Sequence, residues 1–147
     1  MSLILLDTNI VLRLLDRAAP EHFLCVDAIE YLLRRGDTPS LAPQILIEFW
    51  VVATRPVDVN GFGWSEKQTT DAIDHLRALF PLLADTPAIF ETWLALVRTG
   101  VRGKRAHDAK IAAFMQVHGI GEILTLNGSD FYGLPVVAVN PGSLIKR

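Results

Sequence analysis

The sequence predicts an α/β domain built on a mainly parallel sheet. Short apolar runs alternate along the chain with longer segments of helical periodicity, a pattern typical of parallel strands joined by helices. The first apolar run, residues 2–6, is continuous rather than alternating, as expected for a strand buried on both faces. No repeat or long linker interrupts the pattern, and 147 residues suit one domain, residues 1–147.

The helices and strands follow from periodicity and from the residues that begin and end them. Pro43 suits a first helical turn, and Ser65 with Gln68 matches a capping box. Glycines at 36 and 119 are typical of the residue that follows a helix. The expected helices cover about residues 8–16, 20–35, 43–55, 65–80, 86–99 and 108–118. The expected strands cover residues 2–6, 41–42, 82–84, 122–126 and 136–139.

The composition narrows the function classes. The net charge of −2 excludes a globally basic surface, so any phosphate-binding surface must be local. The single cysteine, Cys25, cannot form an intrachain disulfide, and we expect it to be a packed helix residue. The N-terminal apolar run stops at Asp7 and is too short for a signal peptide or a membrane span. We therefore expect a cytoplasmic protein without a membrane partner.

Carboxylates stand at positions where an ordinary hydrophobic core would exclude them. Asp7 directly follows the first apolar run, Glu48 is the one charge in an apolar helical segment, and Asp108 opens another apolar helical pattern. An ionised carboxylate that is buried without a partner is very costly, so such groups are usually paired or bound to a metal. Asp7 and Asp130 also follow predicted strands, where α/β folds bind their ligands. The sequence therefore predicts an acidic, cation-binding pocket.

This donor set indicates Mg²⁺ or Mn²⁺, because both ions prefer hard oxygen ligands. No histidine or cysteine pair has the spacing of a zinc site. A metal held by carboxylates polarises a phosphoryl oxygen and lowers the pKa of a bound water. The expected reaction is hydrolysis of a phosphodiester by in-line attack of that water. The residues that could supply one or two ions are Asp7, Glu48, Asp108 and Asp130.

Each acid also has an ordinary structural explanation. Asp7 could serve only as a helix N-cap, and Asp108 only as a favourable charge in a first helical turn. Glu48 could reach solvent or pair with Arg55, and Asp130 could belong to a simple turn. The pocket would be absent only if all four explanations held together.

Four motifs, in their order along the chain, resemble those of PIN-domain nucleases and more closely the VapC toxins of bacterial toxin–antitoxin pairs. They are Leu5-Leu6-Asp7-Thr8-Asn9, Pro43-Gln44-x-x-x-Glu48-Phe49-Trp50, His107-Asp108-Ala109 and Thr125-Leu126-Asn127-Gly128-Ser129-Asp130-Phe131. The resemblance spans residues 3–140. It implies a three-layer α/β/α sandwich and an endoribonuclease that depends on Mg²⁺ or Mn²⁺. It also implies a homodimer that a VapB-type antitoxin inhibits.

The resemblance carries over residue by residue. The principal metal-site acids of the family correspond here to Asp7, Glu48 and Asp108. Thr8 corresponds to the hydroxyl residue that often supports the first aspartate. The fourth position stays open between Asn127, where some members carry an acid, and Asp130 three residues later. An asparagine still supplies a neutral oxygen, so one metal ion and two remain alternatives.

The sequence indicates the surfaces that would bind RNA or a protein partner less clearly than it indicates the acidic pocket. The densest basic stretch precedes Asp108, and we expect Arg102, Lys104 and Arg105 to hold RNA phosphates. The alternative is a solvated loop, residues 103–105, that balances nearby carboxylates. The amphipathic segments 21–35 and 65–80 could form a groove for an antitoxin helix or a dimer face.

Other function classes fit the sequence less well. A phosphatase with a phospho-aspartate would carry Asp-x-Asp after its first strand, whereas Thr8-Asn9 follows Asp7 here. A receiver-like Mg²⁺-binding domain would need an acidic pair before the first helix, which is not evident. A PIN-like nuclease that acts on another nucleic acid, outside a toxin–antitoxin pair, remains the main alternative.

Overall fold

A parallel sheet forms the middle of the molecule. The computed structural model describes residues 2–146, so the two ends of the expected domain, residues 1 and 147, lie outside the described residues. The strand order is β2-β1-β3-β4, and every neighbouring pair is parallel. The strands are β1 (Leu3–Leu6), β2 (Thr38–Ser40), β3 (Glu122–Leu124) and β4 (Val137–Val139). The predicted α/β class with a parallel sheet is confirmed.

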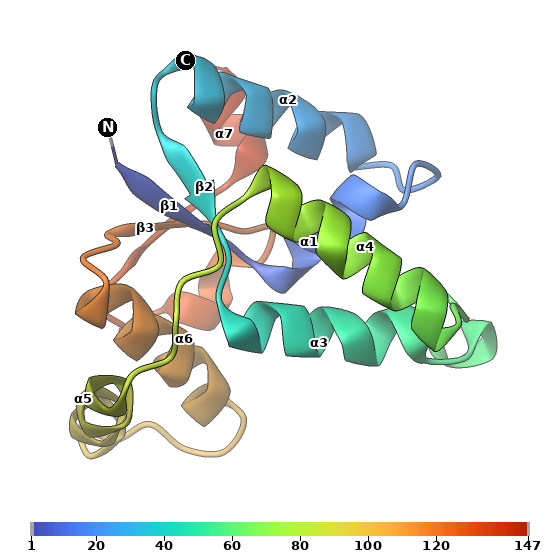
Figure 1. Cartoon of the computed structure of the whole chain (residues 1–147). Coiled ribbons are helices and arrows are strands. Elements are labelled where there is room, and N and C mark those ends of the chain that lie inside the picture. The colour runs from blue at the N-terminus through green and yellow to red at the C-terminus, as the bar shows by residue number, and fades with distance from the viewer. Residues whose placement is uncertain (1, 147) are drawn as a thin grey trace.

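Helices cover both sides of this sheet. Figure 1 shows α2 and α7 together above the strands and α3, α5 and α6 below them, which gives the expected three layers. The α-helices are α1 (Thr8–Leu15), α2 (His22–Arg34), α3 (Pro43–Thr54), α4 (Glu66–Leu79), α5 (Pro87–Val97), α6 (Arg105–Val117) and α7 (Pro141–Ile145). The short 3₁₀ helices are η1 (Val57–Val59) and η2 (Gly128–Phe131).

The second strand is not where the sequence placed it. The expected strand at 41–42 is wrong, because β2 covers Thr38–Ser40 and Leu41 forms only an isolated bridge with Leu82. That bridge is also all that forms of the expected strand at 82–84. Pro39 argued against a strand at residues 38–40, because proline has no N–H to donate to a strand ladder. The structure accommodates Pro39 because β2 lies at the edge of the sheet.

The start of α6 also differs from the prediction, β3 ends at Leu124 rather than at residue 126, and one helix was not predicted. Arg105 begins α6, so Asp108 lies inside the first turn of this helix and the expected basic loop ends at Lys104. The unpredicted helix is α7, whose N-cap Asn140 accepts a hydrogen bond from the backbone N–H of Gly142. The capping box of Ser65 and Gln68 at the start of α4 is confirmed.

The two central strands, β1 and β3, determine which edge of the sheet carries the candidate site residues. Leu5 and Leu6 are fully buried, as their continuous apolar run predicted, and Cys25 is buried in α2. Because β1 and β3 are parallel neighbours, their carboxyl ends lie at the same edge of the sheet. The segments that follow them, α1 and the turn into η2, therefore meet there. None of the helices within residues 2–146 combines the length and hydropathy needed to cross a membrane.

Candidate metal and active site

Asp7 lies at the junction of β1 and α1 and is 7% exposed. Its Oδ1 accepts a hydrogen bond from the backbone N–H of Thr8 at 2.8 Å, so it does serve as the N-cap of α1. Its Oδ2 accepts the hydroxyl of Thr125 at 2.7 Å, and its own N–H donates to the carbonyl of Leu124 at 3.0 Å. The carboxylate is thus held both by the start of α1 and by the residue that follows β3, and a simple N-cap does not require the second contact.

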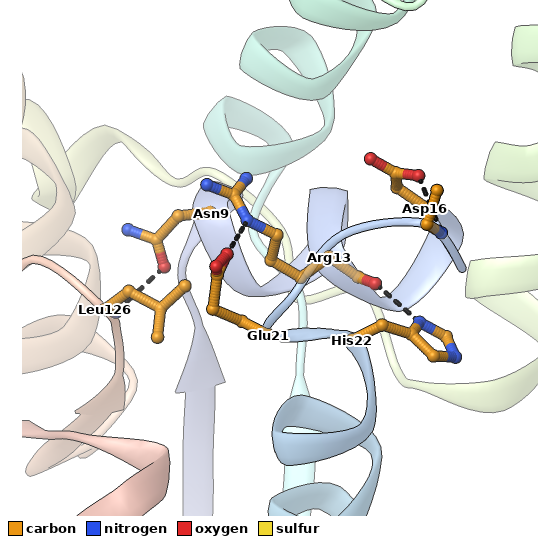
Figure 2. A network of polar contacts seen from close by, with 7 residues as sticks. Asn9, Arg13, Asp16, Glu21, His22 and Leu126 are labelled. Atoms are coloured by element: carbon orange, nitrogen blue, oxygen red, sulfur yellow. Dashed lines mark hydrogen bonds and ion pairs between the residues drawn. The ribbon is translucent and has the colours of Figure 1, made fainter.

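Asn9 completes this network at the sheet edge. Its Nδ2 donates to Asp7 Oδ2 at 3.3 Å and to Thr125 Oγ1 at 3.2 Å. Its Oδ1 accepts the N–H of Leu126 at 3.0 Å, the contact that Figure 2 shows. Neither Asn9 nor Thr125 has a role that the sequence predicted. No local spacing could have revealed one, because the contact between Asp7 and Thr125 joins residues 118 positions apart.

Glu48 extends from the middle of α3 toward the start of α1. Its Oε2 accepts the hydroxyl of Thr8 at 2.7 Å, and its Oε1 accepts the amide of Gln44 at 2.9 Å. The suggested pairing with Arg55 is not formed, because that guanidinium donates to the carbonyl of Asn60. Thr8 therefore supports two acids, although its hydroxyl does not support the first aspartate as the resemblance implied. Its backbone N–H donates to Asp7, and its hydroxyl donates to Glu48.

Asp108 lies half-buried in the first turn of α6. Burial raises the pKa of this carboxyl to about 6, and the charges of Asp130, Asp7 and Glu48 act in the same direction, opposed by Arg105. Burial likewise raises the pKa of Asp7; hydrogen bonds from Thr125 and Thr8 oppose the increase, and the charges of Glu48 and Asp130 add to it. The structure thus brings all four predicted acids within electrostatic reach of one another.

The donor set fits a hydrated divalent cation. Among residues 2–146, no three His, Cys, Asp or Glu side chains stand close enough to form a complete metal-binding group. Mg²⁺ needs no such group, because it usually keeps several waters and takes one or two carboxylates plus substrate phosphate. Zinc, which takes three or four nitrogen or sulfur ligands, fits poorly. A cation would also relieve the repulsion that, together with burial, raises the pKa values of Asp7 and Asp108.

Two exposed residues, Asp130 and Asn127, are the candidates for the fourth ligand position. Asp130 lies in η2, and its charge acts on both Asp7 and Asp108. Asn127 precedes η2, and its backbone N–H donates to Thr125 Oγ1 at 3.0 Å. Both candidates therefore lie beside the acids.

These observations agree with a comparison with known protein families. The sequence profile described as "PIN domain" matches residues 4–136. The chain belongs to the PIN domain family.

Several known proteins are similar to this PIN domain in sequence or in structure. A protein named Ribonuclease VapC24, from Mycobacterium tuberculosis, is 26% identical over 132 residues, 86% of this chain and 87% of that protein. FitAcB from Neisseria gonorrhoeae has a TM-score of 0.69 at 20% identity and covers 95% of this chain and 98% of its own. VapC20 from M. tuberculosis, described as a sarcin-ricin loop cleaving toxin, has a TM-score of 0.63 at 18% identity and covers 89% and 95%. VapBC2 from Rickettsia felis, bound to a promoter DNA fragment, has a TM-score of 0.66 at 16% identity and covers 94% and 98%.

The basic residues of this PIN domain differ in their pairing. Arg102 and Lys104 are exposed, and neither forms an ion pair within the described part of the chain. The Arg105 guanidinium donates to the backbone carbonyl of Tyr132. By contrast Arg13, on the α1 face beside the network, is held by Glu21 at 3.1 Å (Figure 2).

The amphipathic segments of this PIN domain do share a surface. A groove of about 210 Å³ lies between α1, α2 and α4. Apolar side chains provide most of its lining, and Glu30 and His75 also contribute to it. The apolar part of the lining consists of Leu14, Leu15, Val26, Ile29, Leu76, Leu79 and Phe80.

Proposed function

We propose that this PIN domain is a metal-dependent endoribonuclease and the toxin of a toxin–antitoxin pair. The observation that carries the proposal is the convergence of Asp7, Glu48, Asp108 and Asp130, far apart in the chain, on one edge of the sheet. The name Ribonuclease VapC24 of a sequence relative that aligns over most of both chains supports RNA as the substrate. We further propose that the whole chain, residues 1–147, forms this one domain.

The residues have separable roles in this proposal. A bound Mg²⁺ or Mn²⁺ would polarise a phosphoryl oxygen and lower the pKa of a water. Asp7, Glu48 and Asp108 would hold the cation, one or two of them directly and the others through its bound waters, and Asp130 or Asn127 would fill the fourth position in the same way.

Supporting side chains orient these acids and the substrate. Thr8 orients Glu48 through its hydroxyl and Asp7 through its N–H. Arg102, Lys104 and Arg105, at or just before the start of the Asp108 helix, would hold RNA phosphates beside the acids.

Two apolar surfaces suit protein partners: the groove between three helices and an exposed face of α3. The groove between α1, α2 and α4 suits the apolar face of an amphipathic antitoxin helix. Several proteins of similar structure are described as toxin–antitoxin or VapBC complexes, which supports a VapB-type partner. The exposed apolar side chains of Ile47 and Val51 on α3 suit a homodimer. A toxin that cleaves cellular RNA acts in the cytoplasm, where fractionation should find it.

One assay tests the catalytic part of the proposal. The protein is incubated with labelled RNA, labelled DNA and a phosphomonoester, each with Mn²⁺ or with EDTA. We expect only RNA to be cleaved, and only with Mn²⁺. Asp7→Asn and Asp108→Asn should abolish cleavage, whereas Asp27→Asn, an exposed change on α2, should not. Full cleavage by either site variant, or cleavage of DNA alone, would refute the proposal.

A further inference from the structure

Gln44 joins two parts of the acidic site through one amide group. It lies one helical turn before Glu48 on α3, and its Nε2 donates to Glu48 Oε1 at 2.9 Å. The same nitrogen donates to the backbone carbonyl of His107 at 3.2 Å. His107 directly precedes Asp108 in the first turn of α6. One side chain therefore contacts the carboxylate of one site acid and the backbone beside another.

The chemistry of its neighbours fixes the orientation of this amide. An ionised carboxylate and a backbone carbonyl can only accept hydrogen bonds, so the NH₂ group of Gln44 must face them. Its carbonyl oxygen, Oε1, is buried and has no hydrogen-bond partner among residues 2–146. A buried acceptor without a donor destabilises the fold. Stability alone would therefore not favour this residue here, and such local conflicts are expected at functional sites.

Gln44 and Thr8 together restrain both oxygens of Glu48. Thr8 holds Oε2 from the β1–α1 junction, and Gln44 holds Oε1 from α3 itself. A free glutamate side chain samples several rotamers, and fixing it requires restraints of this kind. Metal sites depend on such supporting hydrogen bonds to orient their ligands.

We propose that Gln44 is a positioning residue of the acidic site, which fixes the Glu48 carboxylate and the start of α6 relative to each other so that Glu48 and Asp108 can share one divalent cation. The inference rests on the proposed function and adds Gln44, which that function did not assign, to the residues of the site. Gln44 acts through Glu48 and His107, and the role requires its N–H donors rather than its bulk.

The test compares Gln44→Met with a matched control, Gln116→Met. Methionine keeps the length of Gln44 and removes both its donors and its unpaired oxygen, whereas Gln116 is exposed at the far end of α6. Three quantities are measured: the Tm in EDTA, the Mn²⁺ dissociation constant by calorimetry, and kcat and KM for RNA. For Gln44→Met we expect a Tm within about 4 °C of wild type. Its Mn²⁺ dissociation constant should rise about tenfold or more, with a lower kcat and a nearly unchanged KM.

The outcomes separate a positioning role from a structural one. Wild-type Mn²⁺ affinity in Gln44→Met, or an equal loss in Gln116→Met, would overturn the proposal. If Gln44→Met does not fold, Gln44→Asn takes its place, because it keeps an amide that is one methylene too short to reach both acceptors. A folded Gln44→Asn with wild-type Mn²⁺ affinity would overturn the proposal equally.

The same measurements distinguish this inference from the proposed function. A wild-type protein that binds Mn²⁺ but cleaves no RNA would refute the ribonuclease, and the Mn²⁺ affinities would still decide the role of Gln44. A wild-type protein that does not bind Mn²⁺ would overturn both.

Discussion

At the scale of single residues, the acidic edge of the sheet depends on a few neutral side chains. The Thr125 hydroxyl donates to Asp7 and accepts from Asn9 and from the Asn127 N–H. Asn9 in turn binds both the start of α1 and the segment after β3. These bonds keep a buried carboxylate in one orientation although burial and neighbouring charges raise its pKa.

Thr125→Val tests this network directly. Valine has nearly the same shape but removes a buried hydroxyl that serves three partners, so we expect the free energy of unfolding to fall by about 1–3 kcal/mol. Urea denaturation measures the change. Thr125→Ser keeps the hydroxyl and should lose less. A valine variant as stable as wild type would show that the hydroxyl does not hold Asp7.

At the scale of helices and strands, local sequence patterns predicted most elements. The elements that were predicted wrongly depend on contacts between distant parts of the chain. Pro43 and the Ser65 capping box marked the starts of α3 and α4 correctly. By contrast β2 contains Pro39, and only its place at the sheet edge makes that residue acceptable. Edge position is a property of the assembled sheet, so a local pattern could not supply it.

Ser65→Ala tests the capping of α4, a helix that forms one wall of the apolar groove. The change leaves the N–H of Gln68 without its 3.1 Å acceptor. We expect the free energy of unfolding to fall by about 1 kcal/mol, measured by urea denaturation. Ser143→Ala, at an exposed position of α7, should have little effect. Equal stabilities of the two variants would contradict the assigned cap.

At the scale of the whole molecule, the sequence singled out candidate acids but did not predict how they are held. Asp7, Glu48 and Asp108 stood out because each is a charge beside apolar residues, and this signal survives in a single sequence. The bond from Thr125 to Asp7 depends on β1 and β3 being neighbours, which the strand order in sequence does not reveal. The bridge from Gln44 to His107 depends likewise on the packing of α3 near α6.

The charge of the assembled site makes stability depend on pH. The pKa of Asp108 rises from 3.8 to about 6, so between these pH values the folded protein holds a proton that the unfolded chain has lost. The free energy of unfolding should therefore fall as pH rises through this window and stay lower above it. In EDTA at pH 8, Asp108→Asn should be more stable than wild type, by at most about 3 kcal/mol.

Urea denaturation of both proteins from pH 4 to pH 8 checks this, with Asp27→Asn as the exposed control. The advantage of Asp108→Asn should be absent near pH 4, grow as pH rises toward about 6, and stay constant above that pH. An advantage that does not vary with pH would show that burial and the neighbouring charges do not raise the pKa of Asp108.

Calorimetric titration of Mn²⁺ into wild type, Asp7→Asn and Asp108→Asn tests the central claim most directly, since it asks whether the clustered acids bind a cation at all. Wild type should bind, and each variant should bind about tenfold more weakly or worse while remaining folded by circular dichroism. Equal affinity in all three proteins would contradict a shared cation site at this edge of the sheet.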